Sequence, residues 1–230
     1  MICNIGIFCK YLIFTTVILC FSSNNLLAKT GQCSAHKPVV TVLNSIKPVK
    51  YIRKFYSDDL SKFHNKEDVN GNIVLGLMGG GVNNVFNAKF EVIPQANDKY
   101  CLLMTRLDVE FFALPTIHIA RNFARGSCEY NSILKHELKH VDILKAVYKE
   151  NIYKYKNYVR KISFAAPVLP AMNLVEINRQ KEYMIGYINY ELSRYIQTLL
   201  DDISKRQMKI DTPKSYRDDI GMCNLWRSKL

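Results

Sequence analysis

The stretch from Glu129 to about Lys161 contains neither glycine nor proline, and it constrains the fold of this 230-residue chain more than any other. Apolar residues recur through it at the three- and four-residue intervals of an amphipathic helix. They are Ile133, Leu134, Leu138, Val141, Leu144, Val147 and Tyr148. Ser127, which follows Gly126, is a suitable N-cap residue. The pattern therefore predicts one long helix with a single apolar face.

A second long helix is expected after a break at Pro167 and Pro170. It runs from about Ala171 to Met208, and its apolar residues again repeat on one face. Gly186 weakens this helix without forbidding it. Beyond it, Asp211-Thr212-Pro213 indicates a turn, so the residues that follow are expected to form a C-terminal tail.

The residues before these helices have the pattern of β-structure. Residues 37–56 predict two short strands. Three successive strands are expected after them, at Val85–Ile93, Tyr100–Phe112 and Thr116–Ala120. This part of the chain is therefore expected to form a sheet.

In the strand expected at Tyr100–Phe112, the apolar residues Leu107 and Val109 alternate with charged neighbours. This alternation fits an antiparallel sheet with one face in water. Pro115 opens the next expected strand, and proline at a strand start favours a sheet edge, where an extended peptide can add. The run Gly79–Gly81 lacks the Gly-Lys-Ser/Thr of a phosphate-binding loop and is interpreted as a flexible turn.

Residues 1–28 are predicted to be a secretory signal peptide. An apolar run at 11–21 follows Lys10 and precedes a cleavage pattern that ends at Ala28. The run is short for a membrane helix, and an uncleaved anchor is the alternative. Four cysteines remain in the exported chain, and they predict two disulfides whose pairing stays open. They are Cys33, Cys101, Cys128 and Cys223.

Residues 29–230 are expected to form a single domain, because 48% of the chain is hydrophobic and its length suits one core. The domain is expected to be mainly β over 29–125 and helical over 126–208, with a tail at 209–230. The formal charge is +12, but lysine and arginine are spread along the chain with no tract of five or more. Proteins that bind nucleic acid concentrate such charge in a patch, so a basic exported protein without a nucleic-acid partner is expected.

The sequence His136-Glu137-Leu138-Lys139-His140 places two histidines four residues apart in the first long helix. Residues at this spacing lie on one helix face, one turn apart. Two imidazoles arranged in this way can bind one Zn²⁺, and the glutamate beside the first can act as general base on a water. His136 and His140 are therefore predicted metal ligands, and Glu137 is the predicted catalytic residue. Lys139 and Asp142 depart from the usual pattern, in which residues near the second histidine are mostly uncharged.

A catalytic zinc site needs a third protein ligand. If the second helix returns antiparallel to the first, its residues near 190–196 come level with the motif. Glu191 lies among them, between apolar residues that favour an inward direction, and it is the predicted third ligand. Glu182, Glu176 and Asp211 are the other candidates, with Asp211 just beyond the helix.

A sheet ending in an edge strand, a helix with His-Glu-x-x-His and a second helix together resemble the zincin metallopeptidases. The run from Gly126 to Ile143 is also similar to small, largely uncharacterised bacterial exported proteins with this motif. The resemblance implies an α+β fold with an N-terminal antiparallel β-sheet followed by two long antiparallel helices. It also implies a Zn²⁺ cofactor held by His136 and His140, Glu137 as base, and a peptide or protein substrate. A glutamate on the returning helix is the third ligand of the gluzincin branch, whereas no His-x-x-Gly-x-x-His continues from the motif as in metzincins.

Three hypotheses follow from the sequence. The first is a secreted or periplasmic zinc metallopeptidase. The second is a zincin-like exported protein that binds metal or a partner without turnover. The third is a basic, disulfide-linked binding protein without a metal. Metal content and peptide cleavage distinguish among them.

Overall fold

The computed structural model describes residues 33–63, 74–165 and 169–212, together with positions 214, 215, 218, 221 and 223. The predicted signal peptide at 1–28 lies outside these residues, as does Pro167. The described residues belong to one compact unit, Gly31–Leu230. Its elements, in chain order, are β1 (Val39–Ile46), β2 (Lys50–Ile52), α1 (Ser57–Phe63), β3 (Gly76–Pro94), β4 (Tyr100–Ile119), α2 (Cys128–Phe164) and α3 (Leu174–Gln207).

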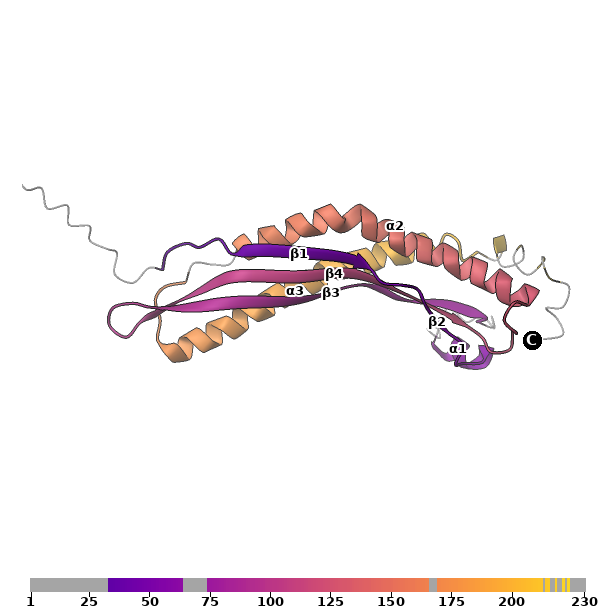
Figure 1. The fold of residues 1–230 in the computed structure, drawn as a ribbon, viewed down its shortest axis with the longest axis horizontal. Helices are drawn as coiled ribbons and strands as arrows, with labels where there is room; N and C mark the ends of the chain where they lie inside the picture. The colour runs from indigo at the N-terminus through magenta and orange to yellow at the C-terminus, as the bar shows by residue number, and fades with distance from the viewer. Residues whose placement is uncertain are drawn as a thin grey trace, which may run out of the picture. The chain divides into compact units, whose positions relative to one another are not determined.

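The central strand of the sheet is β4 (Figure 1). β3 pairs with it antiparallel along its whole length, while β1 and then β2 run parallel to it along the other edge. The α+β class is confirmed, but the prediction of an antiparallel sheet is wrong, because two of the three strand pairings are parallel. The sequence alternation reports which face is buried, and it does not report the direction of the neighbouring strand.

Pro115 lies inside β4, which corrects the prediction that it opens an edge strand. Ala113 accepts a hydrogen bond from the backbone of Lys47 on the β1 side. Residues two apart in a strand direct their backbone groups to the same side, so a backbone N–H at position 115 would also point to the β1 side. β1 ends opposite Ala113 and β2 begins opposite Thr116, so no strand partner stands opposite residue 115 there. The missing N–H of proline therefore costs no hydrogen bond of the sheet.

A bulge changes which residues of β4 face the helices. The pairing with β3 passes from Arg106 directly to Met104, which leaves Thr105 without an opposite residue. C-terminal to the bulge, Leu107 is buried as the sequence alternation predicts. N-terminal to the bulge, Leu102 and Met104 are buried, although the alternation assigns them to the opposite face. The predicted alternation therefore holds only after the bulge.

The run Gly79–Gly81 lies within β3, and the prediction of a flexible turn there is wrong. Gly80 has a φ of 80°, and a Cβ on it would lie 1.9 Å from the carbonyl oxygen of Leu114 in β4. A Cβ on Gly81 would lie 2.9 Å from a methyl group of Leu200 in α3. The glycines therefore let a neighbouring strand and a helix approach β3 closely.

Both long helices pack on one face of the sheet (Figure 1). Buried Leu107 and Phe111 of β4 meet α2 at Leu144 and Tyr148 and α3 at Leu192 in the main core. The hydroxyl of Tyr148 donates to the backbone oxygen of Phe111 at 2.9 Å, which satisfies its buried polar group. The two helices packed on this sheet face thus form the core that supports the His-Glu-x-x-His segment.

The bounds of the two helices differ from the expected ones by up to three residues. Ser127 caps α2 as predicted, and its side chain accepts a hydrogen bond from the backbone of Tyr130 at 3.1 Å. At the start of α3, Asn173 and Glu176 form a reciprocal capping box. Helix α1, at Ser57–Phe63, has no counterpart in the sequence-based expectation.

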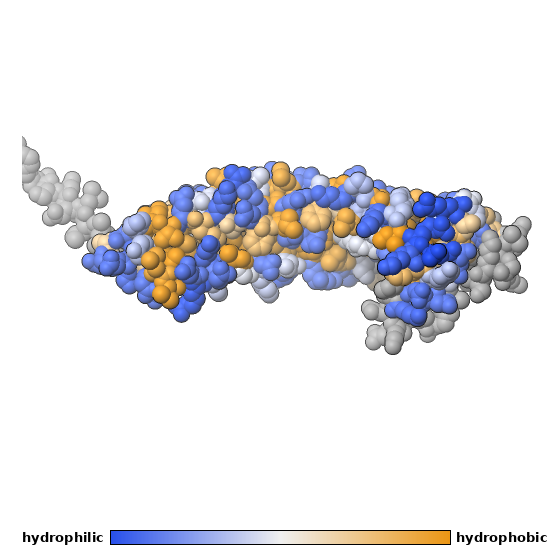
Figure 2. Space-filling model, turned by 60° about the horizontal axis from the view of Figure 1, so that its bottom comes forward, coloured by the Kyte–Doolittle hydropathy of each residue, from blue (hydrophilic) through white to orange (hydrophobic). Residues whose placement is uncertain are grey.

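On the face shown in Figure 2, hydrophobic residues gather in a band near the left end and along the middle, with hydrophilic residues between and around them. Across the described chain, several large hydrophobic residues are exposed. The most exposed are Val175 on α3 and Tyr153 on α2. Within the described ranges, no helix has both the length and the apolar character needed to cross a membrane.

Candidate metal centre

The His-Glu-x-x-His segment lies on the core-facing side of α2, near the start of that helix. His136, Glu137 and His140 are only 4%, 5% and 6% exposed. Lys139 and Asp142, the two residues that depart from the usual pattern, are exposed on the opposite side. Their exposure is compatible with the burial of His136, Glu137 and His140 on the other side of the helix.

Three potential ligand atoms meet at this place: Nε2 of His136, Nε2 of His140 and Oδ1 of Asp211. The two histidine nitrogens are 3.1 Å apart, and Asp211 Oδ1 lies 3.1 Å from His136 and 3.0 Å from His140. The Asp211 side chain is 36% exposed, so the group is open on the side of this residue. This His136, His140 and Asp211 group could hold a metal ion.

The geometry of the group fits a cation better than it fits a set of hydrogen bonds. Each atom contacts the other two at an angle of roughly 60°, and each Nε2 carries one proton at most, so the three contacts cannot all be aligned hydrogen bonds. Ligand atoms around a tetrahedral Zn²⁺ with bonds of about 2.0–2.1 Å lie about 3.3 Å apart. Separations of 3.0–3.1 Å need only a small outward shift to match this value.

Asp211 reaches the histidines because it lies directly after the end of α3. Its backbone N–H donates to the carbonyl of Gln207 at 3.2 Å, which continues the last turn of the helix. Further along the tail, Cys223 forms a disulfide with Cys128, the first residue of α2. The segment with Asp211 is therefore fastened at both ends beside the helix that carries the two histidines.

Burial raises the pKa of the Asp211 carboxyl, but its hydrogen bonds with His136 and His140 outweigh burial and hold the pKa well below its usual range. Asp211 is therefore an anion at neutral pH. An anionic oxygen beside two imidazole nitrogens is a donor set that suits zinc and other divalent first-row metals.

Glu191, the predicted third ligand, lies elsewhere on α3. Its carboxylate accepts hydrogen bonds from the hydroxyl of Tyr158 and from Arg194, and these partners hold its pKa below the usual range. Tyr158 is eighteen residues past His140 on α2, which is about 27 Å of helix. The structure thus does not bring Glu191 to the two histidines.

The reason is an offset between the helices. Met172, just before α3, exchanges two backbone hydrogen bonds with Tyr100 of β4. This link carries the chain onto the sheet before α3 begins, so the returning helix does not start beside the end of α2. The contact between Arg206 and Glu150 shows the result, because it places the last turn of α3 level with the middle of α2. Because of this offset, Asp211 lies beside the His-Glu-x-x-His motif.

The other candidate ligands also lie elsewhere. Glu176 closes the capping box with Asn173 at the start of α3. Glu182 is exposed on the following turns of the same helix. Of the carboxylates considered from the sequence, the described residues therefore place only Asp211 with His136 and His140.

Glu137 lies against strand β3. Burial raises the pKa of its carboxyl to about 7, although the charges of His140 and His136 and a backbone hydrogen bond from Met78 oppose this shift. A general base works best when its pKa lies near the pH of the reaction. The position of Glu137, one residue from His136 and buried on the same side of α2, suits that role.

The sheet edge nearest to Glu137 belongs to β3. The predicted edge strand at Thr116–Ala120 is wrong, because Thr116, Ile117 and His118 have β2 on one side and β3 on the other. In the part of the chain that the structure describes, the outer edge of β3 carries no strand. His118 stacks on Phe55 and is therefore a packing residue of the sheet.

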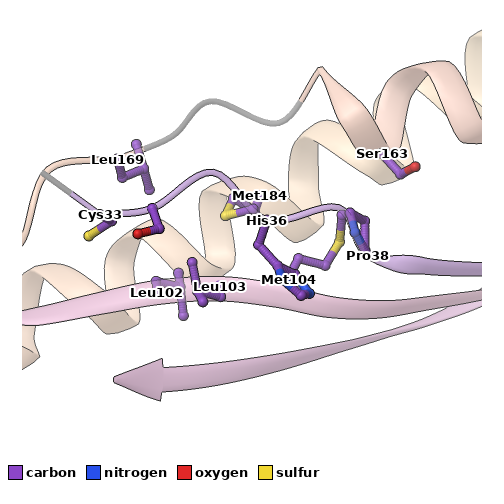
Figure 3. A pocket seen from close by; sticks show the side chains of 10 residues that line it. Cys33, His36, Pro38, Leu102, Leu103, Met104, Ser163, Leu169 and Met184 are labelled. Atoms are coloured by element: carbon purple, nitrogen blue, oxygen red, sulfur yellow. The ribbon is translucent and has the colours of Figure 1, made fainter. Parts of the chain in front are cut away.

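A small cavity of about 30 Å³ lies near the other end of the helical layer (Figure 3). Cys33, His36, Met104 and Met184 are among its lining residues. Its volume is close to that of one water, which is too small for a peptide substrate. Because it contains none of the three ligand residues, the metal centre is the stronger candidate for a functional site.

Both predicted disulfides are present, and the pairing that the sequence left open is Cys33–Cys101 and Cys128–Cys223. They fit an oxidising compartment outside the cytoplasm. Comparison with protein-family models, with curated proteins and with solved structures found no match for this chain.

Proposed function

We propose that this protein is a secreted or periplasmic zinc metallopeptidase, with His136, His140 and Asp211 as zinc ligands and Glu137 as general base. The observation that carries the proposal is the triangle of ligand atoms, 3.0–3.1 Å on each side, beside a buried glutamate of the same helix. A binding site for zinc as a purely structural ion would need a fourth protein ligand. The three ligands that the described residues supply, together with one partly exposed side, favour a catalytic site.

The assignment to zinc rests on the donor set. Two imidazole nitrogens and one carboxylate oxygen are typical of catalytic zinc sites, which keep one position open for water or substrate. Calcium and magnesium prefer oxygen ligands, and copper(I) prefers sulfur. When bound, zinc polarises a peptide carbonyl and makes a water more acidic.

The residues of the chain would then act as follows. His136, His140 and Asp211 hold the ion through the three facing atoms. The Glu137 carboxylate takes a proton from the attacking water while the water oxygen adds to the scissile carbonyl carbon. Glu137 returns that proton to the amide nitrogen as the carbon–nitrogen bond breaks, so that an amine leaves.

A position for the substrate is proposed along the outer edge of β3, in place of the 115–120 segment. This edge begins at Gly76, beside Glu137, and beyond Met78 its outward-pointing backbone groups can pair with an extended peptide. Pairing through the backbone selects a substrate in an extended conformation, as in an unfolded chain or a flexible loop. We therefore expect unstructured polypeptides to be better substrates than folded domains.

The test compares metal content and cleavage in matched variants. The purified protein with both disulfides formed is analysed for zinc and incubated with fluorescently labelled unfolded casein. Glu137→Gln is expected to keep about one zinc per chain and to lose cleavage by a factor on the order of 10²–10⁴. Glu182→Gln is the matched control, because it changes an exposed glutamate of α3 and is expected to keep both properties.

The His136→Ala/His140→Ala double variant is expected to lose both zinc and cleavage. Equal zinc in this variant and in the unchanged protein would refute the metal site. Zinc at one per chain without any cleavage would instead support the alternative function, a non-catalytic exported protein that binds metal or a partner.

A further inference from the structure

The first residue of β3, Gly76, lies directly against the Glu137 side chain. A Cβ on Gly76 would lie 2.4 Å from Cγ2 of Ile133, 2.8 Å from Oε1 of Glu137 and 3.0 Å from Cγ of Glu137. The first two contacts are shorter than real Cβ atoms essentially ever show, so an alanine here would force a neighbouring atom to shift. Gly76 is not among the residues with positive φ in the described chain, so its requirement is one of space and not of backbone conformation.

Met78 supplies the second contact. Its backbone N–H lies toward the Glu137 carboxylate and favours the charged form, which lowers the pKa of that carboxyl. Leu75 points its carbonyl toward β4, where Ala120 donates to it at 2.9 Å. Backbone groups alternate in direction along a strand, so those of Gly76 and Met78 point to the outer edge of β3. At this place Glu137 takes the position of a missing strand partner.

We infer that Gly76 and the backbone N–H of Met78 are positioning elements that hold the Glu137 carboxylate beside the two histidines. Gly76 leaves the space that lets β3 approach α2, and Met78 then fixes one carboxylate oxygen. An ionised carboxylate has about four acceptor positions, so one such bond leaves capacity for a water. The positioning is a property of the chain itself, whereas its effect on catalysis rests on the proposed function.

The other glycines of β3 differ in what surrounds them. A Cβ on Gly79 would lie 3.6 Å from Nε2 of His118, which is an ordinary contact. A Cβ on Gly80 would collide with the backbone of Leu114, so that glycine serves the pairing of β3 with β4. Only the steric requirement of Gly76 is directed at Glu137, which makes Gly79→Ala a matched control for Gly76→Ala.

The direct test is the NMR signal of the Met78 amide, observed after selective ¹⁵N labelling of methionine and assigned with a Met78→Leu variant. A bond to a carboxylate is expected to move the amide proton downfield and to protect it from exchange. Glu137→Ala is expected to move this signal upfield and to speed exchange by about tenfold or more. Gly76→Ala is expected to move it as well, and Gly79→Ala to leave it in place. A Met78 amide that is the same in Glu137→Ala and in the unchanged protein would overturn the inference.

The second readout is kinetic. In zinc-loaded protein, Gly76→Ala is expected to lower kcat on the order of 10²-fold, because a shift of about 1 Å at a catalytic group has that effect. Zinc content and KM are expected to stay as in the unchanged protein. Wild-type kcat together with an unmoved Met78 signal in Gly76→Ala would remove Gly76 from the proposal. If no variant cleaves peptide, the proposed function fails, and the Met78 amide in Glu137→Ala still decides whether the carboxylate is held. If Gly76→Ala does not fold, the Met78 amide in Glu137→Ala still decides whether the carboxylate is held.

Discussion

Oδ1 of Asp211 lies 3.0 Å from Nε2 of His140, although α3 and most of α2 separate the two residues in the chain. Asp211 therefore closes a group that the His-Glu-x-x-His motif begins. The motif supplies two ligand atoms from one helix, and the third comes from the segment after the last helix. Several expectations about metal binding and stability follow from this division.

Replacing Asp211 by alanine is expected to weaken zinc binding by about 100-fold or more, because the site would lose a ligand and not merely an outer partner. Competition with a chromophoric chelator measures the affinity. Glu191→Ala is the paired control: it removes the carboxylate that accepts from Tyr158 and Arg194, which is far from the histidines. The opposite result, with zinc lost in Glu191→Ala and kept in Asp211→Ala, would restore Glu191 as the ligand.

Zinc is expected to stabilise the folded protein, because the three ligand atoms converge only in the folded state. At a free zinc concentration one hundred times the Kd, the gain in unfolding free energy is about 2.7 kcal/mol. For a domain of this size, the corresponding rise in Tm is about 5–10 °C. Thermal scans with and without chelator measure this rise. The His136→Ala/His140→Ala variant should show none, and an equal rise in that variant would mean that zinc acts elsewhere.

The two disulfides are expected to differ in their effect on the metal. Each closes a long stretch of chain, with sequence separations of 68 and 95 residues, and loss of either is expected to cost about 2–4 kcal/mol of stability. Only Cys128–Cys223 fastens the segment that contains Asp211, so the Cys128→Ser/Cys223→Ser variant should also bind zinc less tightly. Calorimetric titration of that variant and of Cys33→Ser/Cys101→Ser measures both affinities, and equal affinities would contradict the expectation.

Ser127→Ala is expected to lower the free energy of unfolding by about 1 kcal/mol, because the N-cap hydrogen bond to the backbone of Tyr130 is lost. Ser127→Asp should restore most of this stability, since aspartate is an equally good N-cap residue. Urea unfolding followed by circular dichroism provides the measurement. Equal stability of Ser127→Ala and Ser127→Asp would show that the cap does not contribute.

Much of the helical layer was predictable, because the burial of a helix face follows directly from local spacing. Val141, Leu144 and Tyr148 recur at helical intervals and are buried as expected. The same spacing predicts that His136 and His140 share one helix face, and in the structure both are buried. Ser127 also marks the start of α2 through local chemistry alone. These features depend on residues within one or two turns of each other.

The sheet was less predictable, because pairing depends on residues far apart in sequence. Nothing local to Val39–Ile46 states that this strand runs parallel to β4, whose paired residues come some sixty positions later. Pro115 was misleading for the same reason: its local signal indicates an edge, while the gap between β1 and β2 is what lets it lie in the central strand. The bulge at Thr105 likewise shifts the burial pattern without a local signal.

The third ligand shows where reasoning along the chain reaches its limit. Counting back from the turn between the helices favours Glu191, because such counting assumes that α3 starts beside the end of α2. The bridge between Met172 and Tyr100 removes that assumption. Asp211 could have been favoured only by knowing this offset, since its own neighbours in sequence indicate no more than a turn.

The position of Asp211 after both long helices also sets an order of events. During synthesis from the N-terminus, His136 and His140 emerge many residues before Asp211. An incomplete chain can therefore offer a metal two nitrogen ligands but not the third ligand, the oxygen of Asp211. The three ligand atoms can therefore converge only after Asp211 has appeared and α3 has packed against α2, so the complete group forms together with the helical core.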